Sequence, residues 1–272
     1  MGSLKATAAM AVLLAAAVPS MTARAADLLP PAPLPEMPFE FNGGGWYLRG
    51  DVGFSNQEVT RLDNIVGIGT VQSIQKGFDA APFGGIGVGY KFNEWLRADL
   101  TGEYRGRSNF HGFDRYVDAT LPTGFGTNEI TASKSEWAGL ANLYIDLGTW
   151  WGFTPFVGGG VGFSHNTIHD YRDTNIVTSG VAFGRESSKT NLAWAVHAGI
   201  AYSVTPNFTV EFAYRYMNLG DARSGDLVTY TGVSNVYNPT TFRELDSHDF
   251  KVGMRWALGG WDHEPAPLVR KY

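Results

Sequence analysis

Apolar and polar side chains alternate with a period of two residues through most of this 272-residue chain. In residues 191–203, for example, the even positions include Leu192 and Trp194, whereas the odd positions are small or polar, as at His197. A helix repeats every 3.6 residues and cannot produce this pattern, but successive residues of a β-strand point to opposite faces. The chain is therefore predicted to be built from β-strands.

Eight segments show this alternation, and each is long enough to cross a bilayer as a tilted strand, which takes about 9–11 residues. They are residues 46–55, 80–92, 95–105, 136–147, 155–167, 191–203, 208–217 and 248–258. Short turns join the second segment to the third, the fourth to the fifth and the sixth to the seventh, while the other connections are long and polar. An even strand number with alternating short and long connections predicts an antiparallel up-and-down barrel.

The charged residues inside these segments all lie on the less apolar face of their strand. The opposite faces carry too much aromatic surface for contact with water. They suit lipid, where a charge at the bilayer midplane costs about 2–4 kcal/mol. The predicted lumen charges are Arg49, Asp51, Lys91, Arg97, Asp99, Glu103, Arg105, Glu136, Asp146, Glu211, Arg215, Asp249, Lys251 and Arg255. Seven basic and seven acidic groups in so narrow a barrel predict a paired, closed interior, and a small-solute path through the polar lumen is the alternative.

Aromatic residues on the apolar faces gather near the ends of the segments, as in the two aromatic girdles of outer-membrane barrels. The predicted lipid-interface aromatics are Trp46, Phe54, Phe92, Phe163, Trp194, Phe208 and Trp256. The predicted fold is thus all-β: an eight-stranded antiparallel transmembrane β-barrel with short periplasmic turns and four long extracellular loops. Residues 108–133 and 218–246 belong to these loops and are predicted to be polar and irregular. Pro82 cannot donate to the ladder and predicts a bulge near the extracellular end of the second strand.

The two ends of the chain lie outside the predicted barrel, which spans residues 45–258. Residues 1–25 have the basic start, short apolar run and small-x-small cleavage site of a secretory signal, with Ala23 and Ala25 at the cleavage position. Residues 26–44 are rich in proline and glycine and predict an extended periplasmic spacer. Residues 259–272 form a short C-terminal tail to which the sequence assigns no role.

Composition excludes several classes of protein. There is no cysteine, which excludes disulfides and thiolate metal sites. The net charge is −5 without a basic block, so nucleic acid is not expected as a partner. No run of 18 or more apolar residues follows the N-terminal signal, which excludes a helical membrane protein.

Two short motifs carry a resemblance to a known family. Gly44-Gly45-Trp46-Tyr47-Leu48-Arg49-Gly50-Asp51-Val52-Gly53, after a proline-rich spacer, resembles the first strand of alphaproteobacterial opacity-type, porin-family surface proteins with an OmpA-like barrel. Lys251, Gly253, Trp256 and Leu258 resemble the last-strand signal that the barrel assembly machinery recognises. Members of the family usually end on the aromatic residue of the last strand, whereas Gly259 to Tyr272 follow here. The resemblance implies an exported protein of the cell outer membrane.

Three groups of residues could be mistaken for chemical sites. The glycine runs at 84–89 and 158–162 fit neither a phosphate loop nor a helix start, and are predicted to be structural. Ser164 and His165 are adjacent in a strand, so their side chains point to opposite faces and cannot act as a catalytic pair. His111, His165 and His169 lack the spacing of metal ligands, although the family resemblance keeps haem or metal binding as an alternative.

The predicted function is that of a non-enzymatic surface barrel with a role in envelope integrity or in adhesion through its loops. The expected partners are outer-membrane lipid, lipopolysaccharide, the assembly machinery and a host or surface ligand at the loops. No cofactor is predicted. The alternatives are a narrow porin and a haem-binding or metal-binding surface protein. The sequence leaves the oligomeric state and the loop ligand open.

Overall fold

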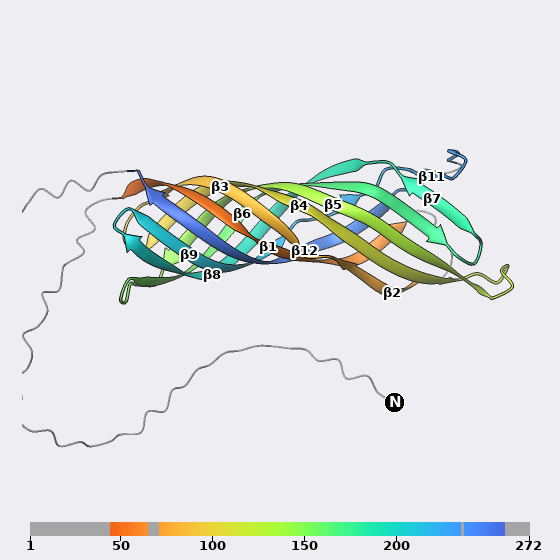
Figure 1. Cartoon of the computed structure of the whole chain (residues 1–272), viewed down its shortest axis with the longest axis horizontal. Coiled ribbons are helices and arrows are strands. Elements are labelled where there is room, and N and C mark those ends of the chain that lie inside the picture. The colour runs from red at the N-terminus through yellow and green to blue at the C-terminus, as the bar shows by residue number, and fades with distance from the viewer. Residues whose placement is uncertain (1–43, 65–70, 235–236, 259–272) are drawn as a thin grey trace, which may run out of the picture. The chain divides into compact units, whose positions relative to one another are not determined.

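The computed structural model describes residues 44–64, 71–234 and 237–258 (Figure 1). The predicted signal peptide with Ala23 and Ala25, the spacer up to residue 43 and the tail of residues 259–272 lie outside the described residues. Within the described part of the chain, no helix is long and apolar enough to cross a membrane.

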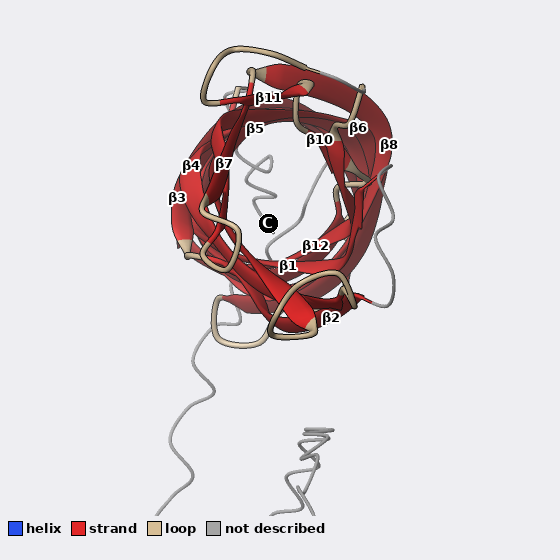
Figure 2. Ribbon diagram, turned by 90° about the vertical axis from the view of Figure 1, so that its right-hand side faces the viewer, coloured by secondary structure: helices blue, strands red, loops and turns tan. Residues whose placement is uncertain are grey.

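Eight long strands close into one antiparallel ring. They are β1 (Gly45–Asn64), β3 (Ala81–Lys91), β4 (Leu96–Val117), β5 (Phe125–Asp146), β6 (Phe153–Asn175), β8 (Ser187–Thr205), β9 (Phe208–Asn218) and β12 (Thr240–Ala257). Each strand pairs with the next in this order, and β12 pairs with β1 to close the ring, with Leu48 opposite Trp256. Figure 2 shows the ring along its axis. The predicted eight-stranded antiparallel barrel is confirmed.

The strands extend further on the loop side than the sequence predicts. β4 runs to Val117 and β5 starts at Phe125, so much of the predicted irregular loop of residues 108–133 is strand. Residues 240–246 of the other predicted loop belong to β12. Four short strands complete this outer part: β2 (Val71–Phe78), β7 (Gly180–Gly184), β10 (Ala222–Arg223) and β11 (Leu227–Thr229). The prediction of irregular loops is therefore wrong over these residues, because the hydrogen-bonded ladder continues beyond the lipid-facing segments.

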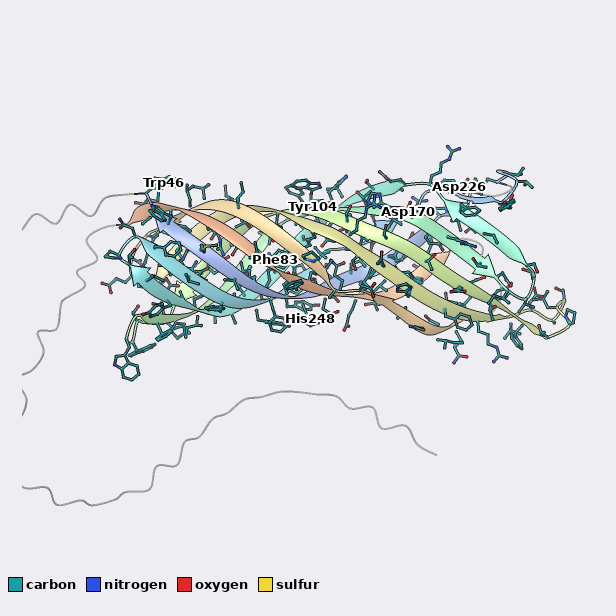
Figure 3. The ribbon with its side chains drawn as sticks, viewed as in Figure 1. Trp46, Phe83, Tyr104, Asp170, Asp226 and His248 are labelled. Atoms are coloured by element: carbon teal, nitrogen blue, oxygen red, sulfur yellow. The ribbon has the colours of Figure 1, made fainter. Side chains whose placement is uncertain are left out.

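The barrel has two halves along its axis, which we call the inner half and the outer half. The inner half begins at Trp46 and ends near Tyr104 and His248, and the outer half continues past Asp170 to Asp226 (Figure 3). Among the described residues, exposed large apolar side chains form a continuous belt on the outside of the inner half alone. This belt marks the part of the barrel that contacts lipid.

Bulges mark the change from the inner to the outer half. The register shifts on β4 between Arg105 and Ser108, and on β5 and β6 near Ser133 and His169. Asp170 and Glu244 have positive φ, at 52° each, where β6 and β12 bend. A bulge inserts one residue and so changes which residues of a strand face inward. These bulges let the same strand follow two different side-chain patterns.

Pro82 lies at one of these bends. The ladder between β3 and β4 ends at Phe83, which pairs with Arg105, and β2 takes over the pairing with β4 from Phe78 onward. The register shift is on β4, the strand that faces Pro82, and not on β3 as the sequence predicts. Proline lacks an N–H group, so the ladder stops at this level on the β4 side, whereas the pairing of β3 with β1 continues through Pro82 to Ala81.

Candidate functional site

The lumen of the inner half holds a layer of charged side chains, which we call the charged layer. The structure places all fourteen predicted lumen charges inside the barrel. Twelve are buried, while Lys91 and Arg255 near the inner end are partly exposed. Arg97, Arg105 and Asp249 are 0% exposed, which leaves no water-filled path along their side chains.

Arg105 is the centre of the outer part of the charged layer. Its guanidinium lies 3.0 Å from Glu103, 3.1 Å from Glu136 and 2.6 Å from Asp249. Arg215 lies 2.8 Å from Glu103 and 2.7 Å from Asp249. Each carboxylate thus contacts more than one cation, and the strands β4, β5, β9 and β12 are linked across the lumen.

Glu211 and Arg49 organise the inner part of the charged layer. Glu211 lies 2.7 Å from Arg255, 3.2 Å from Arg97 and 3.3 Å from Arg49. Arg49 also contacts Asp51 at 2.8 Å and Asp99 at 2.6 Å. The remaining pairs are Arg97 with Asp146 at 3.0 Å and Lys251 with Asp51 at 3.4 Å. Since a buried charge without a partner is costly, the narrow lumen requires this balance.

Sequence analysis missed one buried cation of the same layer. Lys134 is buried and its ammonium contacts Glu136. Residue 134 lies outside the predicted segment of residues 136–147, but it keeps the even positions of β5 that face inward. Extending the period-two pattern by one pair of residues would have found it. Neutral polar groups also join the layer, as Gln57 donates to Glu136 at 3.0 Å and His197 contacts Asn142 at 3.2 Å.

An apolar layer fills the lumen above the charged layer, in the outer half. Phe110 and Phe242 pack edge to face with ring centroids 5.0 Å apart, and Phe78 lies 5.0 Å from Phe110. The buried members of this layer are Val59, Phe78, Phe110, Ile130, Ile168, Tyr171, Met217, Leu219, Leu227, Phe242 and Leu245. The sequence analysis contains no such layer, because it assigned several of these residues to loops.

Comparison with known proteins identifies the family of this barrel. The family model for the outer membrane protein beta-barrel domain matches residues 9–257. The chain belongs to this family. It is accordingly a protein of the cell outer membrane, with its long connections on the extracellular side.

Named relatives cover most of the chain. A candidate adhesin of Rickettsia prowazekii, RP828, is 31% identical over 216 residues, covering 78% of this chain and 87% of its own length. The outer membrane protein PagN of Salmonella typhimurium is 26% identical over 226 residues, covering 79% of this chain and 90% of its own. Among solved structures, OprG from Pseudomonas aeruginosa is 14% identical and has a TM-score of 0.48, covering 80% of this chain and 98% of its own.

The predicted girdle residues of this outer-membrane barrel lie on its outside. Trp46, Phe92 and Trp256 are exposed at the inner end. Phe54, Phe163 and Trp194 are exposed where the two halves meet, and Phe208 is half-buried. Sequence analysis did not name Tyr104 and Trp137, whose rings lie 4.8 Å apart at the same boundary.

The four residues of the predicted assembly signal lie on β12 or directly after it, and they differ in whether they face the lumen or the outside. Lys251 is buried in the charged layer, whereas Trp256 and Leu258 are exposed. A Cβ at Gly253 would come within 2.6 Å of the Asp51 carboxylate, so glycine is needed here for the charged layer itself. The backbone N–H of Leu258 donates to the carbonyl of Trp46 at 2.8 Å and closes the inner end of the ring.

The histidines considered for metal or haem binding do not come together. His165 contacts Thr190 at 2.8 Å, His169 contacts Glu186 at 2.7 Å, and His111 lies 3.7 Å from Asp79. In the described part of the chain, no group of three or more His, Cys, Asp or Glu side chains is placed to hold a metal ion. Ser164 is buried and donates to the carbonyl of Leu219 at 2.6 Å, away from His165.

The extracellular rim presents exposed aromatic side chains on a braced loop. Tyr230 and Tyr237 are exposed, and the Phe183 ring lies 6.4 Å from Tyr230. Asp226 holds the ends of this loop together, as it accepts hydrogen bonds from Ser234 at 2.7 Å and from the backbone of Asn238 at 2.8 Å. A rigid scaffold that carries exposed aromatic residues is suited to recognition.

Proposed function

We propose that this barrel is a non-conducting surface protein that acts by adhesion through its extracellular rim. The observation that carries the proposal is the burial of the lumen. Paired charges fill the inner half and packed aromatic and aliphatic groups fill the outer half, so a solute would have to displace both. A barrel without a path through it has its accessible chemistry on its outside.

The relatives and the rim support adhesion as the role of that outside surface. A relative of similar length is a candidate adhesin. The rim of this chain offers Tyr230 and Tyr237 as contact residues, with Tyr230 83% exposed. Tyrosine combines a large apolar surface with a hydroxyl and loses little side-chain entropy when it binds. A protein or glycan surface on a host cell or in its surroundings is the expected ligand.

The lipid-facing belt defines the remaining expected partners. Membrane lipid contacts the apolar outside of the inner half. Lipopolysaccharide is proposed to contact the outer girdle, where Tyr104 and Trp137 present amphipathic rings. The barrel assembly machinery is proposed to recognise the last strand through Lys251, Gly253, Trp256 and Leu258. An enzymatic role has no support in the geometry of Ser164 and His165, whose partners lie on opposite faces.

Adhesion is tested by expressing the protein on the surface of a non-adherent bacterium. The double variant Tyr230→Ser/Tyr237→Ser should reduce attachment to cultured cells, while the amount of folded barrel in the membrane stays unchanged. Trp151→Ser, at the opposite end of the barrel, is the matched control and should attach like the unmodified protein. Equal attachment of all three at equal surface levels would refute the assignment to this rim.

The closed lumen is tested separately by single-channel recording of the refolded protein in a planar bilayer. The unmodified protein should be silent. Glu211→Ala should remove the carboxylate that Arg49, Arg97 and Arg255 share and produce leak currents. Steady openings of the unmodified protein would make it a narrow porin.

A further inference from the structure

Two aspartates lie on the same level of the outer lumen. Asn175 on β6 donates to the hydroxyl of Tyr116 on β4 at 2.6 Å, across the intervening strand β5. β4 and β6 both run antiparallel to β5 and are therefore parallel to each other. Moving two residues toward the membrane on each strand reaches Asp114 and Asp173. These two side chains thus form the next inward level below the contact between Asn175 and Tyr116.

Both aspartates have a carboxylate oxygen without a partner. Asp114 is only 6% exposed, and its Oδ1 has no hydrogen-bond partner among the described residues. The same holds for Oδ1 of Asp173, which is half-buried. A buried polar atom without a partner is rare in native proteins and calls for a ligand, an ion or water.

The pKa values of both carboxyl groups are raised. The pKa of Asp173 is raised to about 6, first by burial and second by the negative charge of the nearby Asp114. Burial also raises the pKa of Asp114, against the opposing effects of a hydrogen bond from Ser73 and the charge of Lys76. Tyr171 is the other titratable neighbour, and the two carboxylates help to raise its pKa. The surroundings of the pair therefore disfavour the ionised form of both carboxyl groups.

Neutral oxygen groups and an apolar floor surround the pair. Asn128 on β5 lies opposite Asp114 in the register and shares its inward face. The Tyr116 hydroxyl lies above, and the ring reaches this position because residue 126 is glycine, where a Cβ would come within 2.1 Å of the ring. Below the pair lie Tyr171 and the rings of Phe110 and Phe242. The two carboxylates thus lie between neutral oxygen groups and the apolar layer.

We infer that Asp114 and Asp173 bind a divalent metal cation, of the class of Ca²⁺, at the outer mouth of the barrel. Carboxylate, amide and hydroxyl oxygens are the ligands that hard cations prefer, and Ca²⁺ accepts an irregular set of them together with water. Two carboxylates balance the two charges of such an ion. The bound cation links β4 to β6 across β5, and it stabilises the rim from inside.

Terbium luminescence tests this site directly, because Tb³⁺ binds as Ca²⁺ does and accepts excitation from a nearby tyrosine. The full-length protein is refolded in detergent without lipopolysaccharide, so that no lipid phosphate binds metal. Excitation of tyrosine should give saturable Tb³⁺ emission that Ca²⁺ displaces. Asp114→Asn and Asp173→Asn should each weaken binding by at least about tenfold, since each removes one charged ligand.

Asp170→Asn is the matched control, because Asp170 lies on the same strand but is exposed on the outside and contacts Arg107. It should leave Tb³⁺ binding unchanged, and all variants should keep the heat-resistant folded band of a barrel on a gel. Ca²⁺ should raise the melting temperature of the unmodified protein and not that of Asp173→Asn.

Two results would overturn the inference. One is the absence of saturable, Ca²⁺-displaceable emission from the folded unmodified protein. The other is unchanged binding in the double variant Asp114→Asn/Asp173→Asn, which would place the ion elsewhere. Neither result bears on adhesion, which is measured with the tyrosine variants of the rim.

Discussion

The inner and outer halves of this barrel follow opposite rules although they share the same strands. In the inner half, apolar side chains such as Ile86 face outward and charges such as Arg105 face inward. In the outer half, Phe110 and Phe242 face inward, while Arg107 and Asp170 pair on the outside. The solvent explains the difference, since lipid surrounds one half and water the other. Burial alone therefore does not say whether a position should be apolar.

Bulges on β4 and β6 separate the part of each strand with charged inward residues from the part with apolar inward residues. On β4 the inward positions are odd up to Arg105 and even from Ser108 onward. On β6 they are even up to Ile168 and odd from Tyr171 onward, after the positive φ at Asp170. A one-residue insertion moves every later side chain to the other face, so the chain can change its pattern at the membrane boundary.

The largest expected effect comes from breaking the charged layer of the inner half. Arg105→Ala removes the cation that Glu103, Glu136 and Asp249 share, so these three buried carboxylates keep only Arg215 and Lys134 as partners. We expect a loss of about 3–5 kcal/mol in the free energy of unfolding, measured by urea titration in lipid vesicles. The control Arg61→Ala removes an exposed ion pair with Asp63 that solvent screens, so its cost should be far smaller. Similar costs for both variants would contradict the distinction between a paired lumen and a solvated surface.

A smaller effect is expected from the same substitution made on the outside of each half. Ile86→Lys places a charge in the lipid belt, where Ile86 is 76% exposed, and should cost about 2–4 kcal/mol. Val117→Lys places the same charge on the outer half, where Val117 is 61% exposed to water, and should change stability by less than about 0.5 kcal/mol. Parallel unfolding titrations measure both. Equal losses would show that the proposed membrane boundary is in the wrong place.

The smallest expected effect is a pH dependence confined to the outer half. Because the pKa of Asp173 is raised to about 6 in the folded protein, its protonated form is favoured there relative to the unfolded chain. The stabilisation is complete below about pH 4 and is lost as the pH rises through 6, so metal-free protein should be more stable at pH 5 than at pH 7, by about 1 kcal/mol. Hydrogen exchange of β4 and β6 near Asp114 and Asp173 measures this. In Asp173→Asn the stability difference between pH 5 and pH 7 should shrink. If that difference is unchanged, other titrating groups cause the pH dependence.

The sequence by itself determined the strand number, the closed antiparallel ring and the inward set of charges. The reason is that lipid imposes a strict period of two, and a single charge on the wrong face is too costly to keep. This signal is local, because it can be seen within one strand without knowledge of its neighbours. The period-two signal is weaker at the edge of the lipid-facing segment, where the sequence prediction missed Lys134.

Only the tertiary structure decided which charges meet and what lies above them. Arg105 contacts Asp249 from a strand 144 residues away, and no local pattern specifies that partner. Phe110, Tyr171 and the pair of Asp114 and Asp173 face inward because bulges change the phase of the pattern on β4 and β6. Ile130 and Met217 of the apolar layer keep the phase of the charges on their own strands. In water both faces of such strands tolerate polar and apolar residues, so the sequence loses the period of two that lipid enforces. The strand register and the closure of the ring bring these side chains together.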